Sequence, residues 1–75
     1  MRAYKVRLSI AQNVKAFIEL AQACPFDVDV QQGRWLVDGK SPGVFSLNLS
    51  RPVTVIFYGE PSYELERRLS ALRLD

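Results

Sequence analysis

The stretch KSPGVFSLNLSRP, residues 40–52, decides the fold, because it joins two strand-like segments and is too short for a full helix. Ser41 is placed to cap a helix, and Pro42 suits the first helical position, where a missing N–H has no cost. The segment closes at Pro52. We therefore predict a helix of one to two turns over residues 42–49, with apolar side chains at Val44, Phe45, Leu47 and Leu49.

Strand-like segments lie on both sides of this stretch. Residues 53–58 are β-branched or aromatic throughout. Residues 26–30 alternate apolar and acidic side chains, and residues 34–37 form a returning strand after a turn over 31–33 that contains Gly33. Residues 4–8 alternate apolar side chains with Lys5 and Arg7. Four strands are expected, each with one polar face.

Two more helices are expected. Ser9 and Gln12 have capping-box spacing before an apolar stripe of period 3.6, which ends near Pro25. Ser62 can cap a last helix after residue 61. The stripe of the first helix is Val14, Phe17, Ile18 and Ala21, and that of the last is Leu65, Leu69 and Leu72.

The expected order is β-α-β-β-α-β-α, an α+β fold. A four-stranded, mainly antiparallel sheet would carry three helices on one face and water on the other. A ferredoxin-like split βαβ and an open-faced β-sandwich both fit this order. The short second helix and the full third helix favour the open-faced sandwich. With 75 residues and 8.5 kDa, residues 1–75 have room for a single domain.

Composition excludes several classes of protein. A chain that is 48% hydrophobic and 24% charged is a folded domain, and a net charge of +2 does not by itself indicate nucleic acid. No apolar run approaches the roughly 20 residues of a membrane span, and the first residues lack a signal-peptide core. These features predict a soluble, cytoplasmic protein without membrane contact.

The sequence offers little for catalysis. It has no histidine, so no Ser/His or Cys/His pair and no Cys/His zinc site can form. Cys24, the one cysteine, falls at a helix C-terminus and is expected to be buried and inert. Asp27 and Asp29 flank Val28 on the polar face of a strand and are expected to be solvated. We expect no enzyme activity, no metal and no cofactor.

The residues around Ser41 also carry a family resemblance. Residues 37–41 (VDGKS) and 43–52 (GVFSLNLSRP) resemble the regulatory-serine segment of HPr, the histidine-containing phosphocarrier of the bacterial sugar phosphotransferase system. Residues 33–38 (GRWLVD) resemble a signature of a short HPr-like subgroup found in Firmicutes. Ser9-Ile10 with Val14-Lys15-x-Phe17 resembles its first-helix signature. The resemblance covers nearly the whole chain and implies the HPr-like open-faced sandwich.

The resemblance also shows what this chain lacks. The phosphoryl-accepting histidine of HPr would fall at Gln12, and its assisting arginine at Val14. An amide cannot accept and pass on a phosphoryl group, and the charge of nearby Lys15 does not replace a nucleophile. The sequence therefore predicts no phosphocarrier activity through histidine.

In HPr the regulatory serine is phosphorylated by a dedicated kinase, which makes Ser41 the candidate phosphorylation site here. HPr usually has two apolar residues between that serine and the next glycine, whereas only Pro42 separates Ser41 from Gly43. Read without a gap, Lys40 takes the serine position. Ser41 is therefore either a plain helix cap or a phosphorylatable serine.

The resemblance further implies a docking surface for another protein, around the short second helix and the front of the first helix. Its candidate residues are Lys15, Lys40, Pro42 and Phe45. Val44 and Leu47 are expected to face the core, which leaves Phe45 as the exposed anchor. The first hypothesis is thus a non-catalytic HPr-like module that binds a protein. The sequence does not fix its oligomeric state.

A second hypothesis, from another class, is a small-ligand or nucleic-acid binder that uses the open sheet face. Its candidate residues are Lys5, Arg7, Arg34 and Trp35. Single strands are bound by exposed aromatic side chains among basic residues. Trp35 is expected instead to pack in the core or cover a sheet edge, which makes nucleic acid the less favoured partner. A paralogue whose role has left no trace in the sequence is a third possibility.

Overall fold

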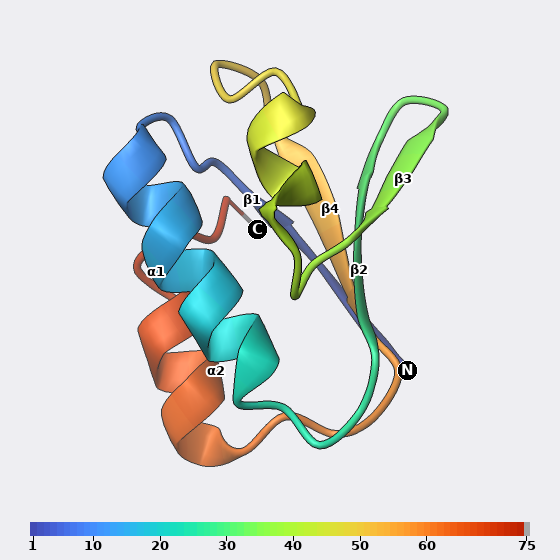
Figure 1. The fold of residues 1–75 in the computed structure, drawn as a ribbon. Helices are drawn as coiled ribbons and strands as arrows, with labels where there is room; N and C mark the ends of the chain where they lie inside the picture. The colour runs from blue at the N-terminus through green and yellow to red at the C-terminus, as the bar shows by residue number, and fades with distance from the viewer. Residues whose placement is uncertain (75) are drawn as a thin grey trace.

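A four-stranded antiparallel sheet with helices on one side forms the molecule (Figure 1). The computed structural model describes residues 1–74. The sheet order is β1-β4-β2-β3, so β1 and β3 are its edges. The elements in chain order are β1 (Arg2–Val6), α1 (Ala11–Gln22), β2 (Val28–Gln32), β3 (Trp35–Asp38), η1 (Pro42–Ser46), β4 (Val53–Phe57) and α2 (Tyr63–Leu69).

The α+β class and the four antiparallel strands are as predicted, but the helices differ. The described residues form two α-helices, and the short second helix that was expected is the five-residue 3-10 helix η1. It stops at Ser46 rather than residue 49, because Leu47 has extended backbone angles, with φ −78° and ψ 163°.

The hairpin between β2 and β3 is tighter than predicted. β2 begins at Val28 rather than at residue 26, and Gln32 pairs with Trp35 across a two-residue turn. Phe26 stays outside the strand because its ring packs edge-on against Phe57, with ring centroids 6.0 Å apart. Gly33, the first turn residue, has φ +59°, which a type II′ hairpin turn requires at that position.

The predicted capping box of the first helix is wrong. The N-cap of α1 is Ile10, and no side chain caps the helix. Ser9 instead adopts φ +58°, and its backbone N–H donates to the carbonyl oxygen of Leu49 at 3.0 Å. A tertiary hydrogen bond thus sets the start of α1, and Gln12 lies exposed in its first turn.

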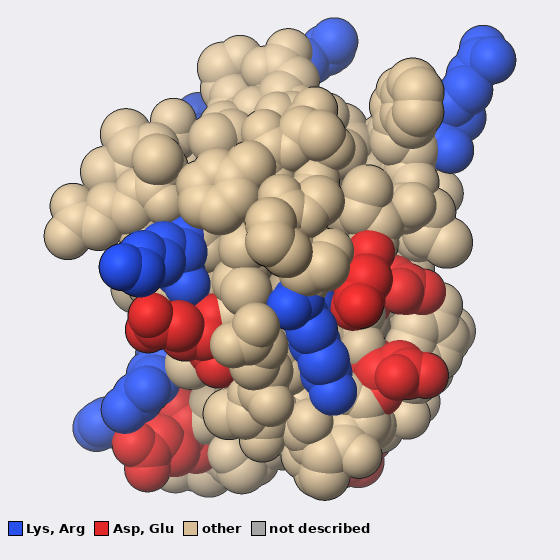
Figure 2. Space-filling view, in the orientation of Figure 1, with Lys and Arg blue, Asp and Glu red and all other residues tan. Residues whose placement is uncertain are grey.

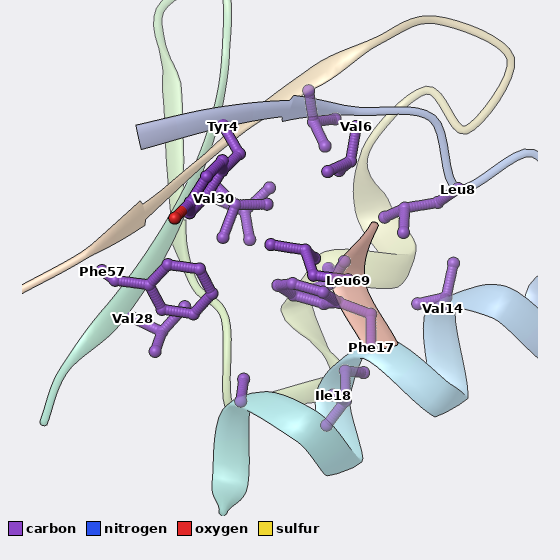
Figure 3. Close-up of a cluster of buried hydrophobic side chains, with 14 of the residues drawn as sticks. Tyr4, Val6, Leu8, Val14, Phe17, Ile18, Val28, Val30, Phe57 and Leu69 are labelled. Atoms are coloured by element: carbon purple, nitrogen blue, oxygen red, sulfur yellow. The ribbon is translucent and has the colours of Figure 1, made fainter. Parts of the chain in front are cut away.

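The core fills the space between the helices and one face of the sheet (Figure 3). The apolar stripe of α1 and the seam residues Leu65 and Leu69 of α2 are buried as predicted, and Leu72 is partly buried. Cys24 is buried too, and this burial raises the pKa of its thiol. The sheet contributes Tyr4, Val6, Val28, Val30, Val53, Val55 and Phe57.

Candidate functional site

Ser41 caps η1, as predicted. Its Oγ accepts a hydrogen bond from the backbone N–H of Gly43 at 3.2 Å and donates one to the carbonyl oxygen of Asp38 at 2.9 Å. Pro42 occupies the start of the helix. A Cβ at Gly43 would lie 3.2 Å from the same Oγ, so glycine leaves room for the cap. The half-buried hydroxyl therefore uses both its donor and its acceptor capacity.

Phe45 is the exposed apolar residue of η1. Its side chain is 45% exposed, whereas Val44 and Leu47 on either side are buried in the core, as the sequence predicted. Because the short helix is fixed by its cap and by Val44, Phe45 is held on the surface together with exposed Pro42.

The first turns of α1 adjoin the segment that follows η1. The bond from Ser9 N to Leu49 O ties the two segments together, and Gln12 and Lys15 are exposed nearby on α1. In Figure 2 the surface over η1 and the start of α1 is mostly uncharged. Gln12, Lys15, Pro42 and Phe45 are thus the exposed candidates on two neighbouring elements, α1 and η1; we call these four residues the η1 surface.

Lys40, the remaining candidate residue, lies two residues before Pro42 and contacts the C-terminal end of α1. Its Nζ donates to the carbonyl oxygen of Cys24 at 3.0 Å, and its own carbonyl accepts from Gln22 Nε2 at 3.0 Å. Lys40 therefore satisfies one backbone carbonyl just beyond the C-terminus of α1, where carbonyls have no partner within the helix. Ten residues of helix, about 15 Å, lie between Gln12 and the last residue of α1, Gln22.

Charge is strongly segregated, which the net charge of +2 conceals. Segments 5–18, 30–37 and 41–55 contain no Asp or Glu but hold Lys5, Arg7, Lys15, Arg34 and Arg51. The antiparallel register gathers these segments at the end of the sheet that carries the turn at Gly33. The upper part of the face in Figure 2 shows Lys and Arg but no acidic side chain. The signal was present in the sequence as acid-free runs, but only the fold shows that they meet.

A hollow with a volume of about 560 Å³ lies at this end. We define the hairpin end as residues 5–7, 31–35 and 48–54. Gln32 holds it together by a double hydrogen bond: its Nε2 donates to Asn48 O at 2.8 Å and its Oε1 accepts from Asn48 N at 2.9 Å. The hollow is lined by side chains that include Lys5, Gln31, Gln32, Trp35, Asn48 and Arg51.

Trp35 lies neither on the open face nor in the core, but it does lie at an edge of the sheet. It pairs with Gln32, two residues from buried Val30, so it lies on the helix side of the sheet rather than on the open face. It is also 68% exposed and so is not part of the core, although it does lie on the edge strand β3. Lys5 alternates with buried Tyr4 and Val6 and does lie on the open face.

The opposite end carries acidic residues without forming a metal site. Asp27 is exposed, as predicted, and Asp29 is half-buried, facing Asp38 across the hairpin. The hydrogen bond between Asp29 and Tyr58 raises the pKa of the tyrosine hydroxyl. Residues 1–74 contain no group of three or more His, Cys, Asp or Glu side chains that could hold a metal ion.

Within residues 1–74, no helix has the length and apolar character needed to cross a membrane. No protein-family model matches the chain, and no curated protein matches it.

Proposed function

We propose that this chain is a non-catalytic, HPr-like module that binds another protein through the η1 surface. The observation that carries the proposal is Phe45, held outward on a Ser41-capped turn beside the first turn of α1. Exposed aromatic side chains on a rigid frame are frequent anchors of protein interfaces. The element order, with a short helix between the third and fourth strands, supports the HPr-like assignment.

The same surface supports a role without phosphoryl transfer. Gln12 stands where HPr would carry its acceptor histidine, and it is exposed in the first turn of α1. Enzyme I with phosphoenolpyruvate should therefore leave the mass of the chain unchanged. If Gln12→His gained one phosphate, the rest of the acceptor site would be intact. Phosphate on the unmodified chain would contradict the proposal.

Docking is tested with enzyme I and HPr kinase as the two probes, by following amide chemical shifts of the isotope-labelled chain. Shifts are expected around residues 9–15 and 42–47. Phe45→Ser should weaken binding of the responding probe about tenfold or more. Tyr63→Ser is the matched control, because Tyr63 is an aromatic residue 81% exposed at the start of α2. The absence of binding to both probes, or equal losses in both variants, would contradict the proposal.

Regulation at Ser41 forms a separate test. A phosphoester has no hydroxyl proton, so phosphorylation would remove the bond that Ser41 donates to Asp38 O. Intact-mass spectrometry after incubation with HPr kinase and ATP should show one added phosphate that is absent in Ser41→Ala. An unchanged mass would leave Ser41 as a helix cap only.

A further inference from the structure

We propose that the hairpin end is a binding site for single-stranded nucleic acid, in which Trp35 stacks on a base and Arg34 and Arg51 contact phosphates. The site is distinct from the η1 surface, and the proposal does not rest on the function proposed above. It rests on an exposed aromatic ring, an adjacent hollow whose lining includes two cations, and the segregation of acidic residues.

Trp35 has the placement of a stacking platform. It is the first residue of β3, directly after a two-residue turn, and its pairing with Gln32 fixes its backbone. The residue is 68% exposed, so a flat ligand can reach the indole ring. Stacking on an aromatic side chain is tolerant of base identity, because every base has a π-face.

The hollow beside Trp35 offers contacts for a sugar-phosphate backbone. It is lined by the cations Lys5 and Arg51 and by amide-bearing Gln31 and Asn48. The double hydrogen bond between Gln32 and Asn48 keeps the Arg51 loop in place relative to the hairpin. Arg34, exposed in the turn itself, extends the basic surface past Trp35.

Segregated charge would direct a polyanion to this end. The three segments that build it contain no Asp or Glu, whereas Asp27, Asp29 and Asp38 lie toward the other end of β2 and β3. A phosphate chain is therefore attracted at the hairpin end and repelled at the opposite end.

The same features favour a single strand over an acidic protein or a duplex. Trp and Arg are also frequent in protein interfaces, but Lys is depleted there and the centre of the interface gathers several apolar side chains. Here Trp35 follows Arg34 in the chain and shares its hollow with Lys5 and Arg51. Stacking on a single indole requires an unpaired base, which a duplex does not present.

The test is a titration with a short oligothymidylate. Trp35 is the one tryptophan of the chain, so its fluorescence reports on the proposed site directly, and we expect quenching. The duplex of the same length should bind more weakly. The logarithm of the association constant should fall linearly with the logarithm of the salt concentration, by about 0.7 for each phosphate contact.

Variants locate the site. The pair Arg34→Gln and Arg51→Gln should reduce the salt slope by about 1.4, because two phosphate contacts are lost. The matched control is Arg67→Gln with Arg68→Gln, which removes the same charge from exposed positions on α2. Trp35→Ala, followed by anisotropy of a labelled oligonucleotide, should weaken binding about 5- to 150-fold. Circular dichroism checks that each variant remains folded.

Several outcomes would overturn the proposal. One is the absence of quenching at low salt, and another is an equal loss of affinity in the two arginine pairs. Equal binding of a poly-glutamate peptide would assign the basic end to an acidic protein instead. Equal binding of the duplex would reduce the site to non-specific attraction without stacking.

Discussion

The hairpin end and the region where α2 packs on β1, which we call the α2 end, use charged residues in different ways. At the α2 end, Glu66 Oε1 accepts hydrogen bonds from Tyr4 Oη at 2.7 Å and from Arg2 at 2.8 Å, which ties α2 to β1. The guanidinium of Arg73 lies 4.4 Å from the centre of the Tyr4 ring. At the hairpin end, an amide clasp at Gln32 supplies the cohesion, and the segments carry cations without any Asp or Glu.

The two ends therefore differ in what their charged side chains contact: other charged side chains at the α2 end, and the surroundings of an aromatic ring at the hairpin end. Pairing accounts for Arg2 and Glu66, since each has its partner within the molecule. At the hairpin end, Arg51 lines the hollow beside exposed Trp35, and Arg34 precedes Trp35 in the turn. A function based on charge is therefore expected at the hairpin end, and stability based on charge at the α2 end.

The largest expected effect comes from breaking the α2 end. Leu69 is fully buried, so Leu69→Ala should lower the free energy of unfolding by about 2–5 kcal/mol, as other buried leucine truncations do. Urea denaturation measures the loss. Leu36→Ala, at a position 57% exposed on β3, is the control and should change stability by less than about 0.5 kcal/mol. Equal values would mean that α2 does not pack on the sheet.

A smaller effect is expected from opening the hairpin end. Gln32→Ala removes both bonds to the Asn48 backbone and should cost about 1 kcal/mol, since water replaces part of each bond. Gln31→Ala serves as the neighbouring control, because the hydrogen bond from Gln31 Nε2 to Gly33 O is long at 3.4 Å. If both variants melt alike in urea, the clasp does not hold the loop.

The smallest effect sharpens the comparison through pH. The bonds from Tyr4 and Arg2 hold the pKa of Glu66 below its ordinary value. The carboxylate therefore stabilises the fold above the ordinary glutamate pKa of about 4.3, and this contribution is lost as the pH falls through the lowered value. Melting temperatures across this acid range should fall less steeply for Glu66→Gln than for the unmodified chain. Parallel curves would show that the cluster adds no acid-sensitive stability.

The predictions from sequence succeed where burial sets the pattern. The stripe of α1 and the alternation of β4 are periodic because each has one face in the core. The Ser41 cap and the exposure of Phe45 depend on the local sequence, so both were predicted correctly from it.

The errors arise from tertiary contacts. Ser9 loses its predicted cap because its backbone bonds to Leu49, forty residues later. Phe26 leaves the strand because its ring packs on Phe57. The hairpin end was not predicted as a basic region, because it forms only where three acid-free segments meet in the fold. The side of the sheet on which Trp35 lies was not predicted either, because it depends on the register with Gln32. The HPr-like identity and its docking partner stay predictions.

The position of β3 at the edge of the sheet has a consequence for aggregation. Its outer backbone groups could pair with a strand of another molecule, and exposed Trp35 and Leu36 would add apolar contact. A short edge strand flanked by charges resists such pairing. β3 has four residues, follows Arg34 directly and ends in Asp38, and these two charged residues act as gatekeepers. Replacing Arg34 removes one gatekeeper, so binding by that variant should be measured together with its sedimentation behaviour, in which self-association would appear first.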